Sequence, residues 1–278
     1  MNHFGKQIIA HSLVDGWTRY VSYVYGGTMG VDDSKPIREQ FLVIVHFKPG
    51  ADFDAVHPAM DIARQTQYVK KILTTELDKE LGGSYGYRIR KTYGIDQLKA
   101  AVGQLVKRHY SKSAIINTLH PRGWEGEVKA GMKRMVCLNN IQALIRDGQL
   151  HFVAQFRSQN AWNSHGNFKG LYELQRLMLS RLEERGLKVN RGGFTVIIAA
   201  AHLYEPDFNG AEQISKEVQA SARLKPCTKI AKLCELAFFV NPSPLCARLK
   251  PCTKRAKLCE FSEPDRAGLI SMTALVQG

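Results

Sequence analysis

Residues 137–158 constrain the fold more than any other part of the sequence. They read CLNNIQALI, RDGQ and LHFVAQFRS, so two strand-like runs flank Asp147-Gly148. Asp-Gly between such runs is typical of a β-hairpin, because both residues tolerate the positive φ angles of a tight turn. Alternate residues of the second run are apolar and share one face of the strand: Leu150, Phe152, Ala154 and Phe156. Arg157 belongs to the other face, and we expect it at the end of the strand.

Further strands are predicted on both sides of this hairpin. Residues 41–47 read FLVIVHF and are followed by Pro49-Gly50, which indicates a buried strand that ends in a turn. Residues 114–119 also read as a strand. Residues 194–204 read FTVIIAAAHLY, and a strand here would place His202 and Tyr204 on one face because they are two residues apart.

Helical spacing of apolar residues appears in three other segments. Residues 60–80 suit a helix that is stopped by Gly82-Gly83. Residues 96–107 suit a second helix with Asp96 as its N-cap. An apolar stripe indicates a third helix, closed by Gly186. The stripe consists of Leu171, Leu174, Leu177, Met178 and Leu182. Helices mixed with hairpin-connected strands predict an α+β fold.

Charge and composition limit the classes of partner. The 278 residues carry a formal net charge of +14, which favours anionic partners such as nucleotides or nucleic acid. Hydrophobic residues make up 44% of the chain, enough for a sizeable core. No apolar run reaches the roughly 18 residues of a membrane helix, and the first residues do not read as a signal peptide. We therefore expect a cytoplasmic protein that does not enter membranes.

The C-terminal part contains a direct repeat. Residues 222–235 read ARLKPCTKIAKLCE and residues 247–260 read ARLKPCTKRAKLCE. Residues 222–260 carry nine Lys and Arg against two Glu, a net charge of +7. The two cysteines of each copy have six residues between them, wider than a zinc knuckle normally uses. We therefore expect no metal site and divide the chain into a catalytic domain, 1–220, and a basic tail, 221–278, which could contact nucleic acid.

Seven short motifs between residues 81 and 208 occur in an order that resembles thymidylate synthase. The motifs are Gly82-Gly83-Ser84-Tyr85-Gly86, Asp96-Gln97-Leu98, Cys137, Arg146-Asp147-Gly148, Arg157-Ser158, Asn167 and His202-Leu203-Tyr204. The same superfamily includes pyrimidine-nucleotide hydroxymethylases. The resemblance implies that sheet and helices pack as in thymidylate synthase, and that the protein forms a homodimer.

The resemblance assigns the reaction centre to Cys137. Carbon 6 of a pyrimidine is a Michaelis acceptor, and a thiolate adds there reversibly, so Cys137 would be the nucleophile. Arg157 would be the cation beside the thiolate. Arg157 and Ser158 would also hold the nucleotide phosphate, since a guanidinium makes paired bonds to its oxygens. Tyr85 would act through a water chain when the proton leaves carbon 5.

The resemblance also implies how base and sugar are bound. Asn167 would read the base, because its amide both donates and accepts and so matches O4 and N3-H of uracil. Hydroxymethylases that act on cytosine are expected to carry Asp at this position, so Asn167 favours a uracil nucleotide. His202 and Tyr204 would bond the sugar hydroxyl. The implied cofactor is 5,10-methylenetetrahydrofolate.

The sequence departs from the family pattern at several of these positions. Leu138 follows the nucleophile where the family often has His. Asn160 replaces a carboxylate that the family uses toward the pterin, so it is the candidate cofactor-binding residue. Ser111-Lys112-Ser113 aligns with the family's Ser-Arg-Arg, which reaches a phosphate across the dimer interface. Lys112 keeps a charge there but lacks the planar fork of arginine.

Two family residues have no unique counterpart. Arg38 is our choice for the amino-terminal arginine that covers the phosphate, with Arg19 as its rival. Glu76 and Glu80 are both available as the glutamate that works on the base. The repeat occupies the place of the family's closing segment over the folate, which suggests an altered end.

Three functions remain open from the sequence. The leading one is one-carbon transfer from 5,10-methylenetetrahydrofolate to C5 of deoxyuridine monophosphate. The second is a pyrimidine-nucleotide 5-hydroxymethylase of the same fold. The third is a catalytically impaired protein that binds a nucleotide or, through its tail, nucleic acid.

Overall fold

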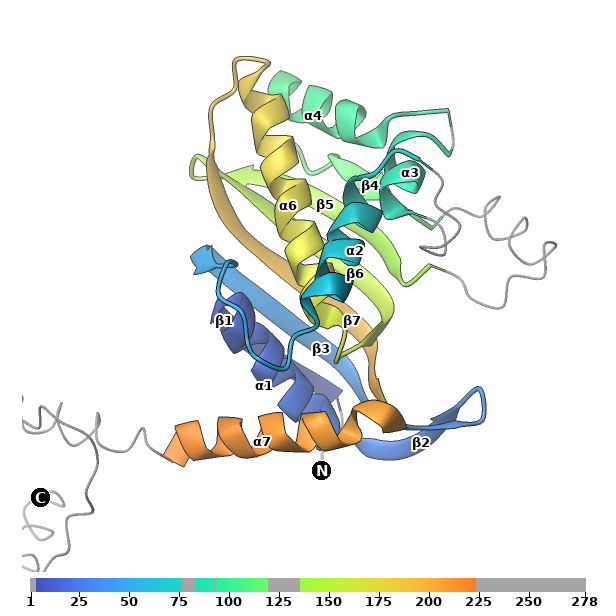
Figure 1. The fold of residues 1–278 in the computed structure, drawn as a ribbon. Coiled ribbons are helices and arrows are strands. Elements are labelled where there is room, and N and C mark those ends of the chain that lie inside the picture. The colour runs from blue at the N-terminus through green and yellow to red at the C-terminus, as the bar shows by residue number, and fades with distance from the viewer. Residues whose placement is uncertain (1–3, 77–83, 93, 120–135, 224–278) are drawn as a thin grey trace, which may run out of the picture. The chain divides into compact units, whose positions relative to one another are not determined.

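The computed structural model describes residues 4–76, 84–92, 94–119 and 136–223. Their strands form one sheet in the order β1-β3-β7-β6-β5-β4, with β2 paired to β3 (Figure 1). The strands are β1 (Phe4–Ser12), β2 (Thr28–Asp32), β3 (Lys35–Asp52), β4 (Ile115–Asn117), β5 (Leu138–Arg146), β6 (Gln149–Asn160) and β7 (Asn190–Tyr204). The α+β prediction is confirmed.

Helices α2, α4 and α6 lie over one face of this sheet (Figure 1). The helices are α1 (Leu13–Tyr25), α2 (Ile62–Leu73), α3 (Tyr85–Arg90), α4 (Gln97–Lys107), α6 (Ser164–Glu183) and α7 (Phe208–Arg223), with the short 3₁₀ helix η1 (Glu205–Asp207) before α7. Among these described helices, none is long and apolar enough to cross a membrane. The cysteines of the tail and all but the first two residues of the repeats lie outside the described residues, and α7 continues past residue 220 to Arg223.

The central hairpin forms as predicted. Strands β5 and β6 are antiparallel, and Asp147 and Gly148 join them with φ angles of 50° and 68°. The predicted apolar face of β6 is buried. The strand continues to Asn160, however, so Arg157 lies within β6 and not at its end.

Other predicted elements differ mainly in their ends. Helix α4 begins after Asp96, whose side chain accepts a hydrogen bond from the backbone N–H of Lys99 at 2.8 Å. Strand β3 runs past Pro49, and its pairing with β1 shifts register between Phe47 and Asp52. Pro49 and Gly50, the latter with a φ of 77°, therefore form an irregularity within the strand and not a turn at its end. Helix α2 ends at Leu73, well before residue 80, because Thr74 is extended. The expected stop at Gly82-Gly83 lies outside the described residues.

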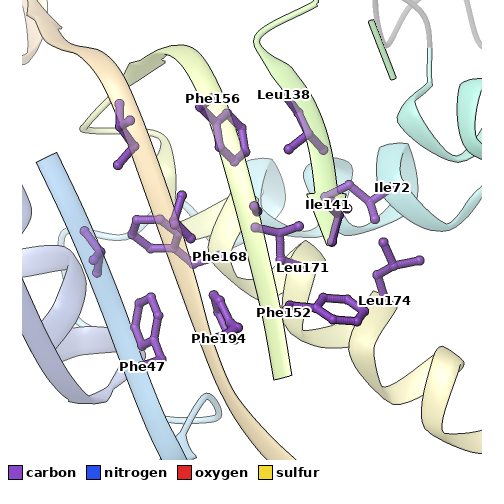
Figure 2. Close-up of a cluster of buried hydrophobic side chains, with 14 of the residues drawn as sticks. Phe47, Ile72, Leu138, Ile141, Phe152, Phe156, Phe168, Leu171, Leu174 and Phe194 are labelled. Atoms are coloured by element: carbon purple, nitrogen blue, oxygen red, sulfur yellow. The ribbon is translucent and has the colours of Figure 1, made fainter. Parts of the chain in front are cut away.

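The core lies between the sheet and helix α6. Phe47, Phe152 and Phe194 project from three strands toward Phe168 and Leu171 of α6 (Figure 2). All five side chains are at most 2% exposed. Burial of each such side chain contributes roughly 1.5–3 kcal/mol to folding, so this layer fixes α6 on the sheet.

Helix α2 packs unusually close to α6. A Cβ atom built on Gly166 of α6 would lie 2.8 Å from Cβ of Tyr68 in α2, which is too close for any residue other than glycine. Gly166 therefore sets the distance between the two helices, and with it the position of Tyr68 and its helical neighbours.

Three neighbouring strands change their burial pattern at the same level. Val43, Ile198 and Phe156 form one buried row across β3, β7 and β6. The next buried row is three residues further along each strand, whereas strict alternation would place it two residues away. This second row consists of Gln40, Ala201 and Gln159.

Pairing among these three strands is unaffected by this change, whereas β5 shifts its register against β6 at this level, between Leu138 and Asn140. The register between β3 and β7, and between β6 and β7, is the same on both sides of the level. Leu42, with a φ of 52°, marks the change in β3. The residues that strict alternation would bury beyond it are half-exposed instead, among them Ser158, His202 and Tyr204.

His165 in α6 makes stability depend on pH. Its side chain is buried against Trp17, at 5.7 Å between ring centroids, and burial lowers its pKa from 6.5 to about 4. The unfolded chain therefore binds more protons between these two values, so the stability present above pH 6.5 is lost as the pH falls toward 4.

We expect the free energy of unfolding to drop by on the order of 3 kcal/mol across this interval through His165 alone. Urea denaturation of the protein and of His165→Phe, at about pH 4.5 and 7.5, measures the difference. The variant should show a smaller drop than the unaltered protein, and equal drops would contradict the assignment.

Candidate active site

Eight of the ten predicted site residues line one cleft of about 790 Å³. They come from α3, the start of β5, β6, α6 and β7. The eight are Tyr85, Cys137, Arg157, Ser158, Asn160, Asn167, His202 and Tyr204. Residues far apart in the sequence therefore meet here, and β6 and β7 contribute through the side chains exposed by the change in burial pattern.

Cys137 lies half-buried at the start of β5 as a free thiol. The Ser158 hydroxyl donates to its Sγ atom at 3.6 Å. The backbone carbonyl of Cys137 accepts from the N–H of Arg157 at 2.9 Å, and the Arg157 Nε atom donates to the carbonyl of Val136 at 3.0 Å. Arg157 and Ser158 thus hold the nucleophile candidate in place from the neighbouring strand.

Tyr85 places its hydroxyl behind the same segment. Its Oη atom accepts a hydrogen bond from the backbone N–H of Leu138 at 3.4 Å. Burial raises the pKa of Tyr85 far above its ordinary value, and the negative charge of an ionised Cys137 raises it further. The phenol therefore stays protonated at neutral pH, and it can relay a proton through water but cannot itself act as a standing base.

His202 and Tyr204 form the opposite wall with carboxylates that sequence reasoning missed. Their rings are tilted edge to face, 5.0 Å apart. The Tyr204 hydroxyl donates to Asp32 Oδ2 at 2.7 Å. Glu39, paired with His202 across β3 and β7, has its pKa raised by burial and by the charge of Asp32.

Asn167 and Asn160 both present side-chain amides to the cleft, but they differ in their hydrogen-bond partners. Asn167 lies in the first turn of α6 and is 7% exposed, and within the described residues its side-chain amide has no hydrogen-bond partner. Asn160 accepts from the backbone N–H of Asn163 at 3.3 Å, and its side chain also bonds the carboxyl of Asp207. Burial raises the pKa of Asp207, and the bond from Asn160 opposes that rise.

Helices α2 and α3 add cations and an aromatic ring that the sequence analysis did not select. Tyr68, Lys71 and Arg88 line the cleft. Tyr68 and Lys71 are three residues apart and so share a helix face. That spacing was readable from the sequence, but only the packing of α2 shows that the face meets Cys137 and Tyr85.

The remaining predicted residues lie outside the lining of the cleft. Arg38 donates to the carbonyl of Tyr25 at 3.0 Å and stacks over the ring of Tyr25 at 4.6 Å. Lys112 is exposed beside β5, and its carbonyl accepts from Gln142 at 2.8 Å.

The alternative candidates are also accounted for. Arg19 donates to the carbonyl of Ile9 at 2.7 Å, and Glu76 forms an exposed ion pair with Lys91 at 2.9 Å. Glu80 lies outside the described residues.

Charges divide the cleft into two sides. Asp32, Asp33 and Glu39 gather near Tyr204, whereas Lys71 and Arg88 lie on the side of α2 and α3. Such a division gives a bound molecule one preferred orientation, because its anionic part is repelled by the carboxylates and attracted by the cations.

Comparison with known proteins gives a consistent result. The family model for thymidylate synthase matches residues 15–238. A protein of Methanosarcina barkeri named "Putative thymidylate synthase" is 27% identical over 218 residues, covering 77% of this chain and 96% of its own. A protein of the same name from Methanothermobacter thermautotrophicus is 29% identical over 133 residues, covering 48% of this chain and 56% of its own.

The thymidylate synthase of Mycoplasma pneumoniae is 29% identical over 159 residues, covering 57% of this chain and 50% of its own. The family match begins earlier and ends later than the motifs at residues 81–208, and it includes every strand from β2 to β7. The chain therefore belongs to the thymidylate synthase family, whose members are one-carbon transferases that act on pyrimidine nucleotides.

Proposed function

We propose that this protein transfers a one-carbon unit from 5,10-methylenetetrahydrofolate to C5 of deoxyuridine monophosphate, through a Cys137 thiolate adduct at C6. One observation carries the proposal: the half-buried thiol of Cys137 opens into a cleft together with seven further side chains expected for this chemistry. Family membership supplies the reaction class.

The nucleotide would lie with its phosphate toward Arg157 and its sugar toward β7. Arg157 and Ser158 offer a guanidinium and a hydroxyl to phosphate oxygens. Tyr204 donates its hydroxyl proton to Asp32, and a phenol oxygen that donates in this way can also accept from a sugar hydroxyl. The carboxylates beside Tyr204 disfavour a phosphate at that end.

The base would be read by Asn167. A nearly buried amide without a protein partner is costly unless a ligand or water satisfies it, and the cleft gives a ligand access to this one. Its Oδ1 accepts from uracil N3-H, and its Nδ2 donates to O4. These bonds would also hold C6 of the base near Sγ of Cys137.

The chain's residues would act in a fixed order. The Cys137 thiolate forms the S–C6 bond, and the C5–C6 π electrons move toward C5 and O4, where Asn167 stabilises the charge. C5 would then bond to the one-carbon unit that the folate supplies. Tyr85, protonated and bonded to Leu138, would orient a water that removes the C5 proton. Release of the thiolate restores the C5–C6 double bond and frees the product.

The cofactor's ring edge would meet Asn160, which lines the cleft at the end of β6. Asn160 replaces the family's carboxylate, yet the carboxyl of Asp207, outside the lining of the cleft, bonds its side chain and keeps an acidic group nearby. The amide of Asn160 would bond the amide-like edge of a reduced pterin. When bound, methylenetetrahydrofolate supplies the carbon unit and the hydride.

The family also supports a homodimer in the cytoplasm. Lys112 lies outside the cleft of its own chain, as expected for a residue that reaches the phosphate in the other subunit. That role stays a prediction, as does the role of Arg38.

Covalent capture of 5-fluorodeoxyuridine monophosphate tests the proposal directly. Fluorine at C5 takes the place of the proton that must leave, so the reaction stops after the first bonds form. A complex in which both Cys137 and methylenetetrahydrofolate are bonded to the base should therefore accumulate. Intact-protein mass should rise by nucleotide plus folate, and Cys137→Ala should give no rise. Folded protein that gives no adduct under any condition would overturn the proposal in favour of a binding protein.

Product mass separates the two enzymatic alternatives. Turnover of deoxyuridine monophosphate should yield the 5-methyl nucleotide. A 5-hydroxymethyl product would instead assign the protein to the hydroxymethylases of this fold.

Replacing Asn167 by Asp should reverse the base preference. A protonated Asp donates to N3 and accepts from the N4 amino group of cytosine, whereas it mismatches uracil. The ratio of affinities for deoxyuridine and deoxycytidine monophosphate, measured by calorimetry, should fall at least about tenfold. Asn140→Asp, outside the cleft, is the matched control, and an unchanged ratio in Asn167→Asp would contradict the role of Asn167.

A further inference from the structure

Helices α2 and α3 form a rigid platform beside Cys137. A Cβ atom on Gly86 would lie 2.1 Å from the carbonyl oxygen of Thr74, so the first turn of α3 touches the end of α2 backbone to backbone. The guanidinium of Arg90 donates to the carbonyls of Leu73 and Gly86 and joins the two ends. Lys71, in the last turn of α2, and Tyr85, in the first turn of α3, are thereby held next to each other.

Lys71 projects from this platform into the cleft. Its Nζ atom lies 5.3 Å from the centroid of the Tyr85 ring, a distance that suits a cation–π contact. Within the described residues the ammonium makes no hydrogen bond or ion pair, although the side chain is only partly exposed. A cation that is partly removed from water and lacks an anionic partner is costly.

The charged and titratable groups that face Lys71 come from three segments. They are Tyr68 on α2, Tyr85 and Arg88 on α3, and Cys137 before β5. Burial lowers the pKa of Lys71, Arg88 lowers it further, and an ionised Cys137 raises it. Burial raises the pKa of the Tyr68 and Tyr85 phenols, so both stay neutral, and Cys137 is left as the candidate anionic partner for the ammonium.

Arg157, the cation expected beside the thiolate, also has structural partners. Its Nε atom donates to the carbonyl of Val136, and its Nη1 atom lies 3.4 Å from the Ser158 hydroxyl. These contacts direct it at the backbone before Cys137 and at the proposed phosphate position. Lys71 lines the same cleft as Cys137, and an ionised Cys137 would interact electrostatically with its ammonium.

We propose that Lys71 is a positioning residue for the nucleophile: its ammonium is the counter-ion that keeps Cys137 ionised before the pyrimidine binds. The inference deepens the proposed function and rests on it for its catalytic meaning. The Cys137 S–H bond breaks with its electron pair left on sulfur, and the proton passes to water. The resulting ammonium–thiolate pair is neutral overall, so the cleft holds it without net charge until sulfur bonds to C6.

Alkylation of Cys137 by iodoacetamide measures the ionised fraction of the thiol without any nucleotide. The full chain is labelled at a series of pH values, and the Cys137 peptide is quantified by mass spectrometry, which separates it from the tail cysteines. The variants are Lys71→Met, which keeps the stem and loses the charge, and Lys71→Arg, which keeps the charge. Lys70→Met, next in the chain but outside the cleft lining, is the control.

We expect Lys71→Met to slow alkylation about tenfold near pH 7 and to shift the midpoint of the profile upward, since an opposite charge at this range favours the ionised form by about that factor. Lys71→Arg should restore the profile, and Lys70→Met should leave it unchanged. A profile of Lys71→Met equal to that of the unaltered protein would overturn the inference. Loss of restoration in Lys71→Arg, with the fold intact by circular dichroism, would also count against it.

The result is distinguishable from failure of the proposed function. If Lys71→Met shifts the alkylation profile but no fluoronucleotide adduct forms, the Lys71–Cys137 ion pair is supported and the proposed reaction is refuted. If the adduct forms but the profile does not shift, the reaction is supported and the role of Lys71 is refuted.

Discussion

The active-site candidate depends on the change in burial pattern that β3, β7 and β6 make at one level. Each strand inserts a three-residue step between two buried rows while the hydrogen-bonded register is kept. A step in one strand alone would break its pairing with both neighbours, and a shared step preserves the pairing. Side chains that alternation would bury, such as Ser158 and His202, are thereby turned into the cleft.

The same step buries two amide side chains, one of which, that of Gln159, lines the cleft. Gln40 and Gln159 are 6% and 2% exposed, and neither side-chain atom of Gln159 has a hydrogen-bond partner within the described residues. Buried amides are normally satisfied by protein or by ordered water, so this region has the character of an internal water site. One backbone feature therefore has two effects: it opens the cleft, and it buries polar amides at a cost in stability.

Close backbone contacts fix the other wall of the cleft. Gly166 lets α2 approach α6, and Gly86 lets α3 touch the end of α2. The backbone positions from which the Tyr85 and Lys71 side chains enter the cleft are consequently fixed by these contacts. This rigidity matters for a thiol, because the strength of its interaction with a nearby charge falls quickly with distance.

The sequence by itself determined the local elements and most of the chemical inventory. Asp147-Gly148 predicted the hairpin because tight turns demand positive φ, and Asp96 predicted a helix start because its carboxylate caps a free N–H. The turn and the cap are readable because each depends on residues close together in the chain. Cys137, Arg157 and Asn167 were selected differently, by a resemblance to a known family in the order of short motifs along residues 81–208.

Only the tertiary structure decided which residues meet. Asp32 pairs with Tyr204 and Lys71 faces Cys137 although more than sixty residues separate each pair, and neither contact leaves a mark in local spacing. Alternation along β6 and β7 also could not foretell the three-residue step, because it is a cooperative property of three paired strands. Packing therefore decided which of these residues line one cleft. It couples segments that are distant in the sequence through shared strand register and close backbone contact.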